Sequence, residues 1–104
     1  MIIENQIGPL ALRMKMIQGM IMQHFIERNC SIIKEISPAN KLKEFSTKRK
    51  TSYNERKKLG IEVTRNLLSE NNDIYAWSSH FEGHKKKDDL ADSFLQALWY
   101  IKQL

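Results

Sequence analysis

The sequence predicts a mixed α/β fold, in which a β-α-β unit is followed by helices that pack on its sheet. Residues 1–6 and 31–36 are short and rich in isoleucine, as expected of strands, and a long apolar segment lies between them. Two parallel strands joined through a helix form a right-handed crossover. With 104 residues, of which 41% are hydrophobic and 28% are charged, the chain has room for one small domain.

The first helix is expected to begin after Gly8-Pro9, because proline is favoured in the first turn, and to end near Asn29. Its apolar residues cover more than one face. They include a stripe at spacings of three and four and additional residues around it, namely Leu10, Met14, Ile17, Ile21 and Phe25, then Leu12, Met16, Met20 and Met22. Either the helix is covered on several sides within the chain, or a second copy of the protein covers one face.

The second strand is expected to end at Ser37-Pro38, since a residue before proline disfavours helix. A short helical turn over 39–45, a polar basic segment and a long helix over 53–69 should follow, with a break at 71–73. A short helix is expected within 74–81 and a final helix over 87–102. We expect the final helix to bury Leu90, Phe94, Ala97, Leu98 and Ile101, and both Trp77 and Trp99 to lie in the core.

The positive charge is concentrated in one segment. The chain has a net charge of +5, and the segment 41–58 alone carries +6. Its eight basic residues are Lys41, Lys43, Lys48, Arg49, Lys50, Arg56, Lys57 and Lys58. This segment is either a polyanion-binding surface, on which each basic residue neutralises a phosphate, or a solvated linker whose charges aid solubility.

The sequence gives no indication of secretion or of membrane insertion. The start MIIENQIGPL lacks a basic region followed by an apolar run, so we expect no signal peptide. Arg13, Lys15 and Gln18 interrupt the apolar segment 10–26, so we expect no membrane-spanning helix. The single cysteine, Cys30, excludes an internal disulfide and agrees with a reducing compartment. We therefore expect an intracellular protein.

Three acidic residues form a candidate metal site. Asp89 and Asp92, three residues apart on the final helix, would lie roughly 5–6 Å apart at Cβ. Glu4 could meet them if the first strand packs against this helix. Hard oxygen ligands favour Mg²⁺, which commonly serves phosphate chemistry. The simpler explanation is that Asp88, Asp89 and Asp92 complement the dipole of a helix start, and that Glu4 is solvated.

Four segments together follow the pattern of a known family. They are Ile3-Glu4-Asn5-Gln6, Ser37-Pro38 with Asn40-Lys41-Leu42, the basic cluster Arg56-Lys57-Lys58, and Asp89-Leu90-Ala91-Asp92. With these motifs the chain resembles the RuvC-like Holliday junction resolvases of the ribonuclease H superfamily. It is most similar to the branch found in poxviruses and related large DNA viruses, and the resemblance covers essentially the whole chain.

The resemblance implies a partial ribonuclease H-like fold, with residues 1–104 as a single resolvase domain, and a Mg²⁺-dependent endonuclease that resolves four-way DNA junctions. Glu4, Asp89 and Asp92 would be catalytic and would bind two Mg²⁺ ions, for which Mn²⁺ could substitute, with Asp88 as an additional metal-site residue. Lys57 or Lys58 would neutralise charge on the reacting phosphate or else contact a phosphate away from the cut. The implied DNA-binding residues are Lys41, Lys48, Arg49, Lys50, Arg56, Lys57, Lys58 and Lys87.

The same resemblance leaves alternatives open. In the family the metal site includes an aspartate on a strand that precedes the glutamate strand, and this sequence starts at the glutamate strand. We therefore expect the chain to be the C-terminal part of a longer or split resolvase. It is either an endonuclease or a non-catalytic DNA-binding or assembly remnant. RNA or a transposon end remains a further possible substrate, because ribonuclease H folds host many nucleases.

Partners also follow from the resemblance. Resolvases of this kind act as twofold dimers, because a four-way junction presents two symmetric strands. The implied partners are thus branched DNA and a second copy of the chain, with the 10–26 helix as the candidate dimer interface. If the protein is viral, its expected location is the site of viral DNA replication in the host cytoplasm.

Overall fold

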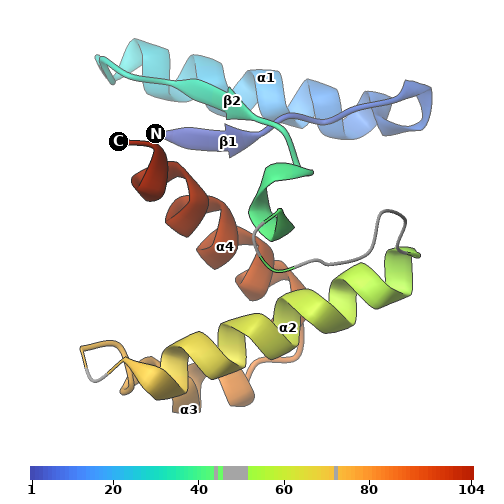
Figure 1. Cartoon of the computed structure of the whole chain (residues 1–104). Helices are drawn as coiled ribbons and strands as arrows, with labels where there is room; N and C mark the ends of the chain where they lie inside the picture. Colours follow the sequence, from blue (N-terminus) through green and yellow to red (C-terminus); the bar gives the residue numbers. More distant parts are fainter. Residues whose placement is uncertain (44, 46–51, 72) are drawn as a thin grey trace. The chain divides into compact units, whose positions relative to one another are not determined.

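The computed structural model describes residues 1–43, 45, 52–71 and 73–104, in a mixed α/β arrangement (Figure 1). The chain divides into two compact units, Met1–Asn40 and Lys41–Leu104. The first unit contains a small parallel sheet, and the second is built from helices. The predicted α/β class and the order of the elements are therefore confirmed.

The first unit is the predicted β-α-β unit. Strand β1 (Ile2–Glu4) is followed by a short 3-10 helix η1 (Pro9–Ala11), helix α1 (Leu12–Glu27) and strand β2 (Lys34–Ile36). The strands are parallel, with Ile3 opposite Glu35 and Glu4 opposite Ile36 (Figure 1). They are shorter than the segments 1–6 and 31–36 predicted for them. The backbone bond from Asn5 N–H to the Ile36 carbonyl (2.8 Å) extends the pairing just past the end of β1.

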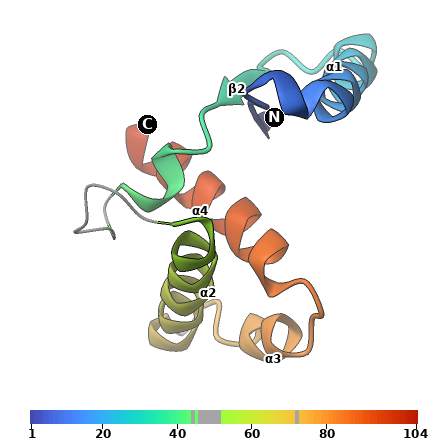
Figure 2. The same cartoon turned by 90° about the vertical axis from the view of Figure 1, so that its right-hand side faces the viewer.

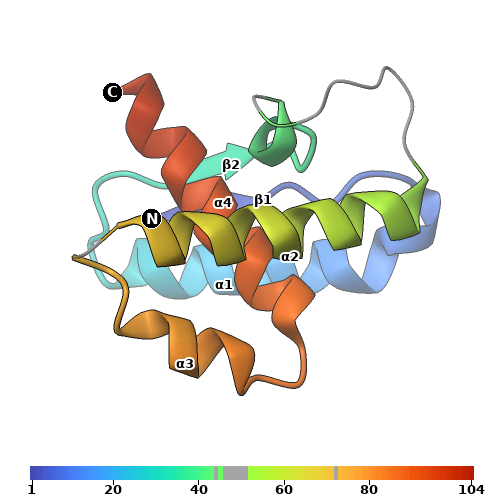
Figure 3. The ribbon, with the colours of Figure 1, turned by 60° about the horizontal axis from the view of Figure 1, so that its bottom comes forward.

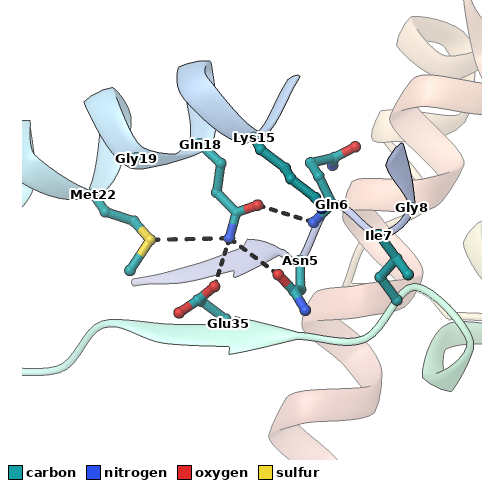
Figure 4. A pocket seen from close by; sticks show the side chains of 9 residues that line it. All are labelled: Asn5, Gln6, Ile7, Gly8, Lys15, Gln18, Gly19, Met22 and Glu35. Carbon is teal, nitrogen blue, oxygen red and sulfur yellow. Dashed lines mark hydrogen bonds between the residues drawn. The ribbon is translucent and has the colours of Figure 1, made fainter. Parts of the chain in front are cut away.

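A buried glutamine joins α1 to the sheet. Gln18 is only 6% exposed. Its Oε1 accepts from the Gln6 backbone N–H (2.9 Å), and its Nε2 donates to Oε2 of Glu35 (2.8 Å) and to Oδ1 of Asn5 (3.5 Å), as Figure 4 shows. These bonds satisfy an amide that would otherwise be costly to bury. Because side chains alternate along a strand, Glu35 and Asn5 face α1, and Glu4 lies on the opposite face of the sheet.

The apolar residues of α1 are largely exposed. Leu12, Met16 and Met20 are 69%, 67% and 66% exposed, and the stripe residues Met14, Ile17, Ile21 and Phe25 are between 38% and 49% exposed. The buried residue of this helix is the polar Gln18. The first unit by itself therefore leaves most of the apolar surface of α1 exposed, and both hypotheses, cover by the rest of the chain and cover by a second copy, stay predictions.

The second unit begins within the short 3-10 helix η2 (Asn40–Leu42) and contains α2 (Tyr53–Glu70), α3 (Trp77–Glu82) and α4 (Lys87–Gln103). The hydroxyl of Ser52 accepts from the Glu55 backbone N–H (3.1 Å) and so caps the start of α2. Helix α4 crosses α2, and α3 lies beside the C-terminal end of α2 (Figures 2 and 3). The predicted ranges 53–69 and 87–102 agree with α2 and α4 to within one residue at each end.

The core of this unit lies where α2 and α4 cross. On α2 the buried residues Gly60, Thr64 and Leu68 repeat every fourth position, so they lie on one face. On α4 the buried residues are Ala91, Leu95 and Gln96. A Cβ at Gly60 would lie 3.8 Å from Cδ1 of Leu95, so Leu95 lies beside that glycine with room for a Cβ in ordinary contact. Phe81 of α3 closes the core beside Leu68 and Ala91.

Two predictions about burial are wrong. Helix α4 was expected to bury Ala97 and Ile101, but Ala97 is exposed and Ile101 is 62% exposed. Small residues on α2 allow the side of α4 that carries Ala91 and Leu95 to pack against it, so the opposite side of α4 faces solvent. Trp77, expected in the core, is 61% exposed because it lies at the start of a short helix whose buried residue is Phe81.

Gly60 offers a direct test of this helix crossing. Alanine has a helix propensity about 1 kcal/mol better than glycine, and its Cβ would make an ordinary van der Waals contact with Leu95. We expect Gly60→Ala to raise the free energy of unfolding by about 0.5–1 kcal/mol in a urea titration. Gly60→Val should instead lower it by about 1–3 kcal/mol through overpacking. Destabilisation by alanine would mean that the helices are closer than described.

Candidate functional site

The predicted metal ligands lie in both units. Glu4 is the last residue of β1, and Asp88, Asp89 and Asp92 lie in the first two turns of α4. Within neither unit do the described residues gather three acidic, histidine or cysteine side chains into a metal-binding group. The three aspartates share one stretch of helix, whereas the meeting of Glu4 with them involves both units and stays a prediction.

The packing of α4 determines where these aspartates point. Asp88 lies three residues before Ala91, and Asp92 lies three residues before Leu95, so both border the buried face. They are partly buried, whereas Asp89 is exposed. Asp88 and Asp92 thus lie at the end of the buried face, next to α2 and η2.

Asp88 is paired with two lysines. Its Oδ2 lies 3.3 Å from Nζ of Lys57 on α2, and its Oδ1 lies 3.7 Å from Nζ of Lys86. Partial burial raises the pKa of Asp88, but the hydrogen bond from Lys57 and the charges of Lys86 and Lys57 outweigh it and hold this pKa below its usual value. Lys57 also lies 4.6 Å from the ring centroid of Tyr53, and contacts with Tyr53 and Asp88 raise the pKa of this lysine.

Asp92 is paired with Lys41. Nζ of Lys41 lies 3.3 Å from Oδ1 of Asp92, and the lysine side chain is 14% exposed against 44% for the aspartate. Leu42, the next residue, is buried and fixes this part of the chain in the second unit. The expected DNA-binding residues Lys41 and Lys57 thus contact candidate metal ligands directly, which the sequence did not predict.

The other predicted DNA-binding residues have different surroundings. Arg56 and Lys58 are exposed on α2, and Lys87 donates from Nζ to the carbonyl of His84 (3.2 Å). Lys48, Arg49 and Lys50 lie outside the described residues. By sequence, the second unit carries a net charge of +4 out of +5 for the chain. The basic residues that attract a polyanion are therefore concentrated in the unit that contains the aspartates.

The aspartates carry ligand atoms of the type that a divalent cation prefers, and a metal ion bound to them stays a prediction. Their carboxylate oxygens are the hard ligands that Mg²⁺ prefers. Two of the three already hold an ammonium cation at 3.3 Å, which shows that this surface stabilises positive charge. Asp89 is exposed and accessible to an ion from solvent. The simpler explanation, that these aspartates stabilise the start of a helix, also has support. Asp88 and Asp89 lie in the first turn of α4 and complement its dipole.

The first unit has a polar pocket that the sequence did not predict. It has a volume of about 480 Å³ and surrounds the buried Gln18, with Asn5, Glu35 and Lys15 among its lining residues (Figure 4). The available sequence signal was a glutamine within an otherwise apolar stretch of α1. Since the amide of Gln18 is bonded to its neighbours, its evident role is to fix α1 on the sheet.

Fold and site together define a small α/β protein in which the acidic start of one helix lies among lysines. The profile of the family described as "Poxvirus A22 protein" matches residues 1–103. The chain therefore belongs to this family, a family of Holliday junction resolvases, and the resemblance noted in the sequence is confirmed.

A relative in another large DNA virus agrees with this membership. The chain is 29% identical to the uncharacterized protein L451 of Acanthamoeba polyphaga mimivirus, in an alignment that covers 97% of this chain and 28% of the relative. The chain thus spans little more than a quarter of the length of that relative. No solved structure gives a significant match. Over the described residues, we find no helix with the length and apolar character needed to cross a membrane.

The ion pairs of Asp88 predict a pH-dependent stability. Because its pKa is lowered in the folded state, the stabilisation is present above the unfolded-state pKa of about 3.9 and is lost as the pH falls through the folded-state pKa. We expect Asp88→Asn to lower Tm by a few degrees at pH 7, and the difference from wild type to shrink as the pH falls below about 4, through the lowered folded-state pKa. Thermal unfolding followed by circular dichroism measures both. The matched control is Asp73→Asn, an exposed aspartate whose change should leave Tm nearly unaltered; an equal effect there would contradict a specific role for Asp88.

Proposed function

We propose that this chain provides a metal-dependent endonuclease site that hydrolyses phosphodiester bonds in four-way DNA junctions. The observation that carries the proposal is the start of α4, where Asp88, Asp89 and Asp92 lie in two successive turns and two of them hold cations. Its support is membership in a resolvase family together with a β-α-β unit of the kind that a ribonuclease H-like fold contains. The ribonuclease H-like assignment is part of the proposal.

The side chains have distinct roles in this proposal. Asp89 and Asp92 bind metal through their carboxylate oxygens, and Glu4 joins them from the end of β1. Asp88 supports the site while it holds Lys57 and Lys86. Two Mg²⁺ ions, for which Mn²⁺ can substitute, supply when bound an activated water and stabilisation of the leaving oxygen. Lys57, close to Asp88, is placed to neutralise charge on the phosphate.

Binding of the junction is attributed to the basic residues of the second unit. Arg56 and Lys58 present their charges to solvent on α2, one turn or less from Lys57. Each such residue that meets a phosphate releases condensed counterions, which supplies affinity without dependence on sequence. The start of α4 then determines where along the bound strand the cut occurs.

A second copy of the chain completes the proposed arrangement. Paired cuts in two symmetric strands need two sites related by a twofold axis. Helix α1 offers an exposed apolar surface, including Leu12, Met16 and Met20, of the kind that a dimer interface buries. We propose that α1 forms this interface.

The second candidate function is a non-catalytic DNA-binding or assembly protein. The observation that favours it is the pairing of Asp88 and Asp92 with Lys57 and Lys41, because acidic residues retained for ion pairs need no metal. Asp92 must bind metal if the chain is an endonuclease. It need not bind metal if the chain is a non-catalytic DNA-binding or assembly protein.

A variant of Asp92 separates the two candidates. We expect Mg²⁺-dependent nicking of a synthetic four-way junction, at symmetric positions, and we expect Asp92→Asn to reduce its rate by more than about 100-fold because a metal ligand is lost. Denaturing gel electrophoresis of labelled strands measures the rate. The control is Asp73→Asn, which makes the same chemical change between α2 and α3, away from the start of α4. Unchanged cleavage by Asp92→Asn would remove this residue from the metal site, and the absence of cleavage by wild type would favour the non-catalytic function.

The basic segment is tested through the salt dependence of binding. We expect simultaneous replacement of Lys48, Arg49 and Lys50 by glutamine to weaken junction binding and to reduce the slope of log K against log salt by up to about 0.9 per lost phosphate contact. Fluorescence anisotropy at several salt concentrations gives the slope. The control removes the same charge from the first unit by changing Lys15, Arg28 and Lys34. An unaltered slope in the first variant would indicate a solvated linker.

A further inference from the structure

We propose that Trp77 and the rings that follow it on α3 form a stacking site for an unpaired nucleobase of the DNA, and that Lys85 holds the phosphate beside that base. The inference rests on the proposed function, because it names a contact with the same substrate. It concerns a surface that includes neither the proposed metal ligands nor the basic segment 41–58. All of its residues belong to the second unit.

Trp77 borders an apolar cavity between α2, α3 and α4. Its volume is about 330 Å³, and Leu68, Phe81 and Phe94 line it together with Trp77. This volume lies at the lower end of the range of roughly 300–1,000 Å³ that is usual for small-molecule sites. Trp77 is 61% exposed, whereas Phe81, one turn later on the same helix, is 4% exposed. An aromatic side chain that borders an apolar cavity and also meets solvent can cover a flat ring that enters from outside.

Three rings form a row along α3. Trp77, His80 and His84 follow one another at spacings of three and four, so they share one side of the helix and of the turn after it. The ring centroids of Trp77 and His80 lie 5.9 Å apart at an interplanar angle of 90°, and those of His80 and His84 lie 6.1 Å apart at 48°. No ring is stacked flat on its neighbour, so the contacts within the row leave ring faces open to a base. Nδ1 of His84 accepts from the Lys86 backbone N–H (3.1 Å), which fixes the last ring.

The row leads into a positively charged segment. Directly after His84 the chain continues with Lys85-Lys86-Lys87, and Lys85 is exposed. The acidic residue of α3, Glu82, has its charge balanced by Arg65 of α2, whose Nε lies 2.5 Å from Oε1 of Glu82. A phosphate next to the stacked base would therefore meet positive charge at this end of the row.

Charge favours a nucleobase over an apolar side chain of a protein partner. An apolar side chain would use the cavity alone, whereas a DNA strand brings a flat ring for the aromatic row and a phosphate for Lys85 in one ligand. The second unit carries a net charge of +4 by sequence, and the chain belongs to a family of Holliday junction resolvases. The base is expected at the branch point of the junction, because unstacking costs least where pairing is weakest.

The primary test separates the contribution of the bases from that of the phosphates. The probes are a labelled single-stranded oligodeoxynucleotide and an abasic strand of the same length, which keeps the phosphates and lacks the bases. In the full chain, Trp99→Phe leaves Trp77 as the only tryptophan, and we expect the strand with bases to quench its fluorescence and the abasic strand to leave it unchanged. By fluorescence anisotropy, Trp77→Ala should weaken binding of the strand with bases by about 5- to 150-fold and of the abasic strand by less than about twofold.

The matched control for Trp77 is Tyr75→Ala. Tyr75 is 60% exposed and lies two residues before Trp77, but it lies outside the residues that line the cavity. Its loss should change affinity for either strand by less than about twofold. Trp77→Phe keeps a ring at the site and should retain more affinity than Trp77→Ala, and circular dichroism is recorded for each variant to verify folding. Equal quenching by both strands, or equal losses of affinity in Trp77→Ala and Tyr75→Ala, would overturn the proposal.

The role of Lys85 is tested through salt dependence. We expect Lys85→Gln to weaken binding of both strands and to reduce the slope of log K against log salt by about 0.7, because one phosphate contact to a single strand is lost. Trp77→Ala should leave the slope unaltered. The control is Lys15→Gln, the same change at an exposed position of the first unit. An unaltered slope in Lys85→Gln would overturn the placement of the phosphate.

The outcomes separate this inference from the proposed function. If wild type nicks four-way junctions and Trp77→Ala binds both strands as wild type does, the proposed function stands and the stacking site is wrong. If the strand with bases quenches Trp77 and the abasic strand does not, but wild type nicks no junction, the stacking site is supported and the endonuclease is wrong. If wild type binds neither strand and no junction, both are wrong.

Discussion

The packing of α4 on α2 beside Gly60 is the contact on which the candidate site depends. Leu95 of α4 lies next to Gly60 of α2, and the face of α4 with Ala91 and Leu95 is the buried one. Asp88 and Asp92 precede these residues by one turn, so the same contact places them beside α2 and next to Lys57 and Lys41. The orientation of the aspartates is thus a consequence of core packing.

The ion pairs at the start of α4 bear on the stability of the protein and on its proposed function. The lysines that hold Asp88 and Asp92 reduce the repulsion between neighbouring carboxylates and allow three aspartates to occur in two turns of helix. They also add positive charge to the unit that carries most of the net charge of the chain. A surface of this kind attracts a polyanion toward the acidic start of α4, as the proposed function requires.

In the first unit, α1 is fixed on one face of the sheet, and its outward surface is apolar and exposed. Gln18 fixes α1 on one face of the two strands through bonds to the Gln6 backbone and Glu35, and the alternation of side chains leaves Glu4 on the other face. On α1 itself, leucine and methionine side chains face outward. The unit is thus suited to carry a ligand on one side and a partner on the other, which agrees with the proposed metal ligand and the proposed dimer.

The sequence by itself determined the class of fold, the order of the elements and most of their boundaries, because apolar spacing, Gly8-Pro9, Ser37-Pro38 and the capping Ser52 act locally. It also indicated the family, through short motifs that keep their residue types and spacing. Tertiary structure decided which face of α4 is buried and which lysines meet which aspartates. Nothing in the local sequence pattern distinguishes Ala97 from Ala91 as a core residue. The small residues that determine which side of α4 is buried lie on α2, some 30 residues earlier in the chain. Ion pairs between distant segments depend on which face of α4 is buried, so the pairing of Lys41 with Asp92 became visible only in the folded protein.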